Sequence, residues 1–156
     1  MKERKYSAKL KKILSVFVLA VMTCGILAGS ISGMSMTASA SSKAAYLKSY
    51  MKLEKKCKKK FTYSGTQMEI NRDAYNEYKL WDKELNRVYK KIKSSLSNKR
   101  ANKLVVSERK WIKKRDKKAA KDASGWAGGT GYTMAYNGSL TDQTKSRIKW
   151  LIRNYA

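Results

Sequence analysis

The fold is predicted mainly from residues 66–96, which read TQMEINRDAYNEYKLWDKELNRVYKKIKSSL. Its apolar residues recur in steps of three and four, which places them in one stripe along an α-helix. Thr66 followed by Glu69 is a capping box, in which each side chain accepts a hydrogen bond from a free amide at the helix start. No glycine or proline interrupts the run. The pattern predicts a long amphipathic helix with a stripe made of Ala74, Tyr78, Trp81, Leu85, Val88, Ile92 and Leu96.

A third helix is predicted beyond the break at residues 97–99. Apolar residues again recur at helical spacing, from Ala101 to Ala119. Glu108 and Arg115 fall on the same stripe, and a charged residue in such a place lies at the rim of the core or is paired.

The segment that follows, residues 123–138, is rich in glycine and aromatic residues and lacks periodicity. It is predicted to be a long irregular loop that ends in an Asn137-Gly138 turn. Ser139 or Thr141 is then expected to cap a last helix. No strand is needed anywhere, so the predicted fold is all-α, a small bundle of three to four helices with a Gly-rich loop before the last helix.

The first forty residues have the parts of a secretory signal. A basic start precedes an apolar run over residues 13–29, and Ala38-Ser39-Ala40 is typical of a signal-peptidase site. Two alternatives remain open, a lipid-modified Cys24 and an uncleaved membrane anchor. The predicted organisation is a signal peptide at 1–40, a basic lead and partly helical arm at 41–65, and a helical domain at 66–156. The product is expected to be secreted, extracellular or associated with a bacterial cell wall.

The arm is unusually rich in lysine. Apolar residues near its start are spaced loosely as in a helix, whereas the Lys-Lys-Cys-Lys-Lys-Lys end is almost pure charge. This pattern predicts a partial helix running into a flexible basic arm, with a loosely packed first helix as the alternative. The lysines that would contact a polyanion are Lys55, Lys56, Lys58, Lys59 and Lys60.

Several short motifs resemble the lysozyme inhibitor LprI-like N-terminal domain family, small helical proteins of the bacterial envelope. They are Gln67-Met68-Glu69-Ile70-Asn71, Asp82-Lys83-Glu84-Leu85-Asn86, Ser107-Glu108-Arg109-Lys110-Trp111, Arg115-Asp116 and a C-terminal Arg147. The resemblance implies a helical fold and a lysozyme-inhibitor-like activity. The motif positions, structural or in contact with a partner, are Gln67, Glu69, Asn71, Asp82, Glu84, Leu85, Asn86, Trp111, Arg115, Asp116 and Arg147. An Arg115–Asp82 ion pair beside a buried Trp111 would lock two helices together.

The family usually carries several cysteines, and this chain lacks most of them. Asp73, Ala119 and Ser139 stand where cysteines are expected. Beyond residue 40 only Cys57 is left, which cannot form an internal disulfide. It is expected to be a free thiol, an intermolecular crosslink point or a remnant of the family pattern.

Charge is the strongest compositional feature. The formal net charge is +25, and about +20 of it lies beyond residue 40. Such a domain attracts polyanions. In the expected compartment these are anionic wall polymers or anionic lipid surfaces, and nucleic acid would bind only nonspecifically because no nucleic-acid module is evident. The leading hypothesis is a secreted non-enzymatic binding domain with an anionic partner. The alternatives are a lysozyme inhibitor-like protein that acts by protein–protein binding and a membrane-active polycation.

The sequence offers little for catalysis. It contains no histidine, so the usual metal sites and histidine acid–base chemistry are not expected, and neither is a cofactor. Glu69, Asp73 and Glu77 form a row at the start of the long helix, where carboxylates favour the helix dipole. This row is also the candidate anionic docking strip for a cationic lysozyme. Alternatively, it receives lysines from the first helix of the same chain.

Overall fold

The structure, a computed structural model, describes residues 35–156, and in this range it contains helices and no strands. The range falls within one compact unit. The predicted all-α bundle with a Gly-rich loop before its last helix is confirmed. The predicted signal segment lies outside the described residues except for its last six positions. The elements are α2 (Ser35–Lys60), α3 (Gln67–Ser94), α4 (Asn98–Ala123), the short 3₁₀ turn η1 (Ser124–Trp126) and α5 (Tyr132–Tyr155).

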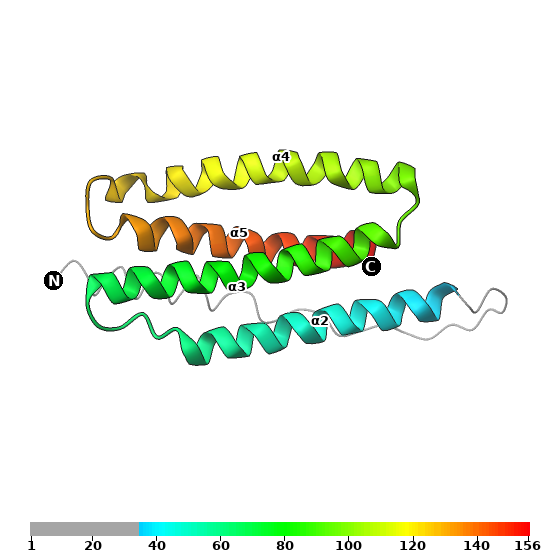
Figure 1. Cartoon of the computed structure of the whole chain (residues 1–156), viewed down its shortest axis with the longest axis horizontal. Coiled ribbons are helices and arrows are strands. Elements are labelled where there is room, and N and C mark those ends of the chain that lie inside the picture. Colours follow the sequence, from blue (N-terminus) through cyan, green and yellow to red (C-terminus); the bar gives the residue numbers. More distant parts are fainter. Residues whose placement is uncertain (1–34) are drawn as a thin grey trace, which may run out of the picture. The chain divides into compact units, whose positions relative to one another are not determined.

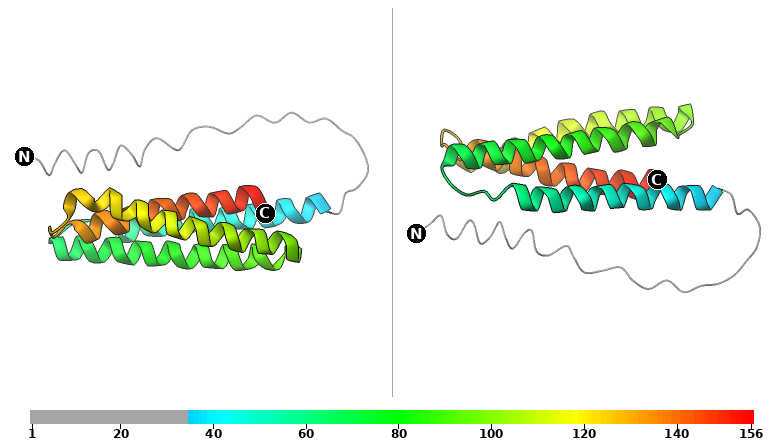
Figure 2. Two further views of the ribbon diagram at one scale, coloured as in Figure 1. Left: turned by 90° about the horizontal axis from the view of Figure 1, so that it is seen from above. Right: turned by 60° about the horizontal axis from the view of Figure 1, so that its bottom comes forward.

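Helix α5 is the central element of the bundle. It packs along α3 and α4 and also touches α2, whereas α3 and α4 make few contacts with each other. Figure 1 shows α5 between α4 and α3, with α2 on the far side of α3, and Figure 2 shows from two further directions that α2 also runs beside α5. The result is that α3 and α4 are both supported by α5 but lie apart from each other.

The long helix predicted from the opening motif is α3. Thr66 and Glu69 form the capping box, with Glu69 Oε2 accepting from the Thr66 amide at 2.8 Å and Thr66 Oγ1 accepting from the Glu69 amide at 3.3 Å. Trp81 is fully buried, and its ring centroid lies 4.9 Å from that of Tyr50 on α2. Burying each large apolar side chain of this stripe contributes roughly 1.5–3 kcal/mol.

Helix α2 corrects the prediction for the basic arm. It continues without a break to Lys60, so the predicted flexible arm is wrong. Tyr50, Cys57 and Phe61 are spaced seven and four residues apart, and all three are buried in the core. The lysines on either side of Cys57 hide this stripe in the sequence, because they occupy the remaining faces of the same helical turn.

Helix α5 begins earlier than predicted. The loop between η1 and α5 is short, and α5 starts at Tyr132 and runs through Asn137-Gly138 as regular helix. The predicted long loop and turn at 123–138 are therefore wrong in extent, as is a helix start at Ser139 or Thr141. The reason is a cap supplied from α3, since Asn71 Oδ1 accepts from the Met134 amide at 3.1 Å. Asn71 Nδ2 also donates to the Thr130 carbonyl at 2.8 Å.

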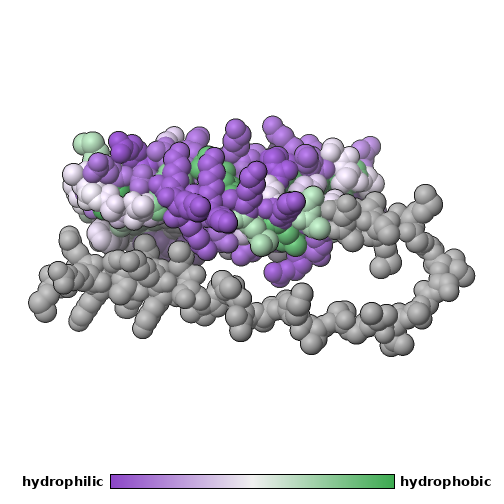
Figure 3. Space-filling model, turned by 90° about the horizontal axis from the view of Figure 1, so that it is seen from below, coloured by the Kyte–Doolittle hydropathy of each residue, from purple (hydrophilic) through white to green (hydrophobic). Residues whose placement is uncertain are grey.

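Hydrophilic side chains dominate the surface. Figure 3 shows the side of the bundle on which α2 lies, where hydrophobic patches are interspersed among extended hydrophilic side chains. Leu47 and Met51 of α2 are among the exposed apolar residues, with Met51 exposed to 66%. Within the described residues, no helix is long and apolar enough to cross a membrane.

Candidate functional site: the groove between α3 and α4

The separation of α3 from α4 leaves a groove of about 490 Å³ between them. Its walls combine apolar and aromatic side chains with charged ones, an arrangement common in binding sites. Leu85 and Tyr89 come from α3, and Trp111 and Ile112 from α4. The remaining residues that line this groove are Asp82, Asn86, Lys93, Val105, Glu108, Arg109 and Arg115.

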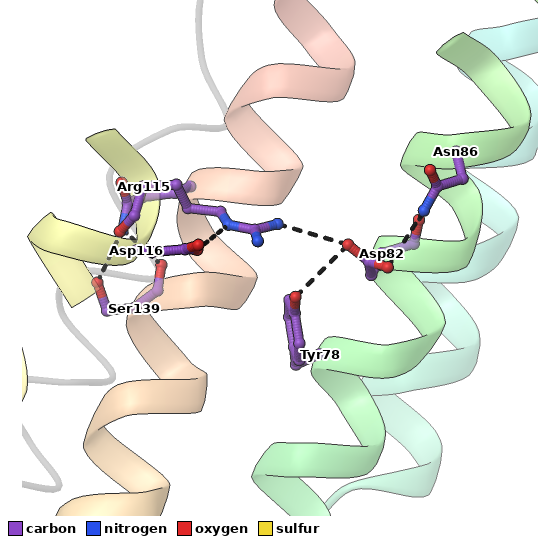
Figure 4. Close-up of polar contacts among 7 residues, drawn as sticks. Tyr78, Asp82, Asn86, Arg115, Asp116 and Ser139 are labelled. Carbon is purple, nitrogen blue, oxygen red and sulfur yellow. Dashed lines mark hydrogen bonds and ion pairs between the residues drawn. The ribbon is translucent and has the colours of Figure 1, made fainter. Parts of the chain in front are cut away.

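Arg115 and Asp82 form an ion pair across the groove. Arg115 Nη1 lies 3.4 Å from Asp82 Oδ1, and Arg115 Nε donates to Asp116 Oδ1 at 2.9 Å (Figure 4). Burial opposes the charge on Arg115, but the Asp116 hydrogen bond and nearby carboxylates outweigh it and raise the pKa of the guanidinium. Arg115 therefore stays charged although its residue is only 8% exposed.

Two neighbours on α3 hold the Asp82 carboxylate in place. Asn86 Nδ2 donates to Asp82 Oδ2 at 3.1 Å and to the Asp82 carbonyl at 2.9 Å. The Tyr78 hydroxyl lies 3.5 Å from Asp82 Oδ1 (Figure 4). Because these residues are spaced by one helical turn, α3 itself aims the carboxylate at Arg115.

A second, more buried pair, Arg147–Glu108, lies near the same Trp111 ring. Arg147 of α5 contacts Glu108 of α4 at 2.8 Å, and its Nη2 donates to Ser107 Oγ at 2.9 Å. Arg147 also lies over the Trp150 ring, 4.1 Å from its centroid, and 5.4 Å from that of Trp111. Burial raises the pKa of Glu108, while Arg147 and Arg115 oppose that rise.

The Arg115–Asp82 pair is the one expected from the resemblance, and the structure contains it. Trp111 lies beside it but is half-buried rather than buried, because its ring also forms part of the groove wall. The Arg147–Glu108 pair was not predicted from the sequence. Glu108 could have indicated this pair, because a carboxylate on the apolar stripe of a helix requires a partner when it is buried.

The other motif residues lie outside the groove and make contacts within the bundle. Gln67 donates to Asn71 at 3.1 Å, and Asn71 caps α5 as described above. Glu84 is on the far face of α3, where Arg87 contacts it at 2.7 Å and Ser49 of α2 donates to it at 2.8 Å. Those two hydrogen bonds outweigh burial and lower the pKa of Glu84.

The predicted docking strip is not a continuous exposed row. Glu69 is exposed but occupied in the capping box, and Asp73 is half-buried. Glu77 is buried and accepts hydrogen bonds from Tyr63 at 2.5 Å and Trp81 at 3.2 Å. Its cationic neighbour is Lys145 of α5 at 3.8 Å, not a lysine of the first helix. A partner therefore has little access to the strip.

The five lysines at the end of α2 are all exposed, as a polyanion contact requires. They are distributed around the helix rather than along one face, and Lys58 lies 4.0 Å from Glu54. Cys57 lies between these lysines in the sequence and is a free thiol in the core. Burial is the main cause that raises the pKa of this thiol to about 11. Its buried position argues against the reading of Cys57 as a crosslink point.

Within residues 35–156 no cluster of three or more cysteine and carboxylate side chains is arranged to hold a metal ion. The groove instead has aromatic walls and two arginines, Arg109 and Arg115, of which Arg115 is held by Asp82 and Asp116. Aromatic and arginine side chains are enriched where proteins contact a partner.

These features define a class, a small all-α domain whose helices are joined by arginine–carboxylate pairs, with an open groove on one side. The family model described as "Lysozyme inhibitor LprI" matches residues 57–151, so the chain belongs to the LprI lysozyme inhibitor family. The matched range begins inside α2 and ends inside α5. No curated protein and no solved structure matches the chain.

Proposed function

We propose that this protein is a lysozyme-inhibitor-like binding domain that acts by protein–protein contact through the α3–α4 groove and without catalysis. The family supports the activity. The observation that supports the location is that motif residues from two separate parts of the sequence meet in one groove. These residues are Asp82, Leu85, Asn86, Glu108, Arg109, Trp111 and Arg115.

The groove has the composition of a protein contact site. Trp, Tyr and Arg are enriched among residues that dominate binding energy, and the groove holds Trp111, Tyr89 and Arg109. Ile112 at its rim is 39% exposed and offers an apolar anchor. Because the Arg115–Asp82 pair already fixes the two walls, a partner would meet a largely preorganised surface.

The net charge restricts which lysozyme the groove can approach. Glycosidases of this kind carry two carboxylates beside the scissile bond, so an acidic substrate cleft would attract the basic rim of the groove. A strongly cationic lysozyme would be repelled at long range by a product whose net charge is about +20 beyond residue 40. We therefore expect added salt to speed association with a cationic lysozyme, because it screens this repulsion.

A matched set of variants tests this function. Ile112→Ser and Arg109→Gln alter the groove rim, whereas Val106→Ser and Lys110→Gln make the same kinds of change at exposed positions of α4 that do not line the groove. We expect the groove variants to raise the inhibition constant roughly tenfold, in the range of a single interface residue, and the controls to leave it unchanged. The measurement is a stoichiometric titration against a panel of lysozymes. Equal effects in both pairs, or no inhibition of any lysozyme, would refute the proposal.

The proposal places the protein outside the membrane. This location is inferred from the basic start, the apolar run and the Ala38-Ser39-Ala40 site of the sequence. The secreted product should begin near Ser41, which N-terminal sequencing of secreted material tests. Recovery of the intact chain in the membrane fraction would instead favour an anchor.

A second candidate function is binding to an anionic polymer of the cell surface. The observation that favours it is the distribution of lysines over the described helices. The five lysines at the end of α2 fit it poorly, because they are distributed around the helix and one of them lies beside Glu54. Helix α4 provides a better-ordered surface, described next.

A further inference from the structure

The outer face of α4 carries a row of lysines along nearly its whole length. The row is Lys99, Lys103, Lys110, Lys113, Lys117 and Lys121, with Val106 at the one intervening position. Successive members, Val106 included, are three or four residues apart, so all of them point to one side of the helix. All six lysines are exposed. The row lies opposite the buried stripe of α4, which contains Leu104, Glu108, Arg115 and Ala119.

No carboxylate of α4 lies within this row. Glu108 points inward to Arg147, and Asp116 is bonded to Arg115. Asp122 pairs with Lys118, a lysine outside the row, at 2.8 Å and accepts from Ser139 of α5. Among the described residues, the ion pairs involve none of the six lysines. Like charges at this spacing destabilise a helix, so the row costs stability that a bound anion would recover.

We propose that the α4 lysine row binds a linear polyol-phosphate polymer, with one phosphate in each repeating unit, laid along the helix. From Lys99 to Lys121 the helix rises roughly 33 Å, with about one lysine for each helical turn of 5.4 Å. A flexible chain of singly charged units can place successive phosphates at such intervals. The row therefore matches an extended linear polyanion better than a compact anion, which would meet only one or two lysines.

The composition of the row argues against a nucleic acid strand. Proteins that bind single strands combine positive charge with aromatic side chains on which bases stack. The only aromatic residue of α4 is Trp111, which faces the groove. A ligand of this row is therefore held through its phosphates alone, as expected for a polymer without bases.

The row also does not suit a lipid surface. Helices that lie on membranes insert an apolar face beside their charged one. The row offers a single exposed apolar residue, Val106. The exposed apolar pair Leu47 and Met51 belongs to α2, a different helix. The α4 row can therefore hold a ligand mainly through charge, without an apolar face to insert into a membrane.

Binding of synthetic poly(glycerol phosphate) by the purified chain tests this inference. The variant changes Lys103, Lys110, Lys113 and Lys117 to Gln. The control changes Lys48 and Lys52 of α2 and Lys79 and Lys91 of α3 to Gln, which removes the same charge from exposed positions that do not form one row. We expect the α4 variant to raise Kd at least about tenfold and to flatten its salt dependence, since four charge contacts are lost, and the control to change Kd less than about threefold.

The α4 positions are exposed, and a thermal melt checks that both variants fold. If one does not, the paired changes Lys103/Lys110 and Lys113/Lys117 replace it, each compared with two of the control positions. Equal weakening in both variants would overturn the proposal, because net charge alone would then explain binding. Two other ligands serve as comparisons, oligo-dT of equal phosphate number and phosphatidylglycerol vesicles. The proposal would also be overturned if either bound as tightly as the polymer and lost affinity in the same α4 variant.

Discussion

The guanidinium of Arg147 on α5 contacts the Glu108 carboxylate on α4 at 2.8 Å, and both residues are buried. The two are 39 residues apart in the chain, and both lie in the range that the LprI family model matches. The pair fixes the rotation of α4 against the central helix. Through Glu108 it also supports the floor of the α3–α4 groove.

Replacing Arg147 by Met should destabilise the fold by about 3–5 kcal/mol, because a buried carboxylate loses its partner. Changing Glu108 to Leu in the same chain should restore much of the loss. Urea unfolding of the two single variants and the double variant measures the coupling. A double variant as unstable as Arg147→Met alone would show that packing of Arg147 on Trp150, not the ion pair, carries its contribution.

The destabilisation by Arg147→Met should depend on pH. Burial raises the pKa of Glu108, and loss of Arg147 removes a group that opposes this rise. A carboxylate with a folded pKa above its unfolded value destabilises the fold as pH rises through that range. We therefore expect the variant to approach the parent in stability at acid pH and to fall behind it toward neutral pH. Unfolding curves at several pH values check this trend, and a constant difference would contradict it.

Arg115→Met should cost less than Arg147→Met, about 1–2 kcal/mol. The carboxylates that it leaves behind, Asp82 and Asp116, have side chains 30% and 47% exposed, so water can solvate them. A double-mutant cycle with Asp82→Asn measures the coupling across the groove. A cost as large as that of Arg147→Met would mean that Arg115 contributes mainly through its contacts with the Tyr78 and Trp111 rings, 5.6 and 5.1 Å from their centroids.

Cys57→Ser should lower the melting temperature by several degrees, because a hydroxyl in the core loses its hydrogen bonds with water at a cost of roughly 1–3 kcal/mol. Lys56→Ser, at the exposed neighbouring position, is the control and should have little effect. The native thiol should also react slowly with a disulfide reagent near neutral pH, since burial raises its pKa to about 11. Rapid reaction in the absence of denaturant would place Cys57 outside the core.

Asn71→Ala should destabilise the junction between the glycine-rich loop and α5 by about 1–2 kcal/mol, the usual cost of losing a helix cap. Asn76→Ala, at an exposed position of the same helix, is the control. Hydrogen exchange should show lost protection first at the Met134 amide, which Asn71 caps. Uniform loss along α5 would instead indicate global destabilisation.

Periodicity in the sequence predicted α3 and α4 well, because both carry an unbroken apolar stripe on a polar helix. It failed for the end of α2, where Cys57 and Phe61 belong to the core although lysines surround them. It also failed for the start of α5. There Asn137-Gly138 signals a turn locally, whereas the cap from Asn71, 63 residues away from Met134, makes the segment helical. Contacts between distant residues decided both places, and neither leaves a local pattern.

The site was predicted only in part for the same reason. The Arg115–Asp82 pair followed from the resemblance, but the groove depends on α3 and α4 being held apart by α5, and no sequence spacing specifies that separation. Glu77 illustrates the opposite error. Its place in a row of carboxylates suggested an open docking strip, yet Tyr63 and Trp81 bury it.

The central position of α5 has a consequence for the order of folding. Helices α2, α3 and α4 precede α5 in the chain, yet the contacts that join α3 to α4 run mainly through α5. While the chain is being synthesised, the first three helices therefore lack the α5 side chains Ile148, Leu151 and Ile152 that complete their common core. The domain can close only after α5 is available, so until then the chain remains accessible to chaperones and to proteases.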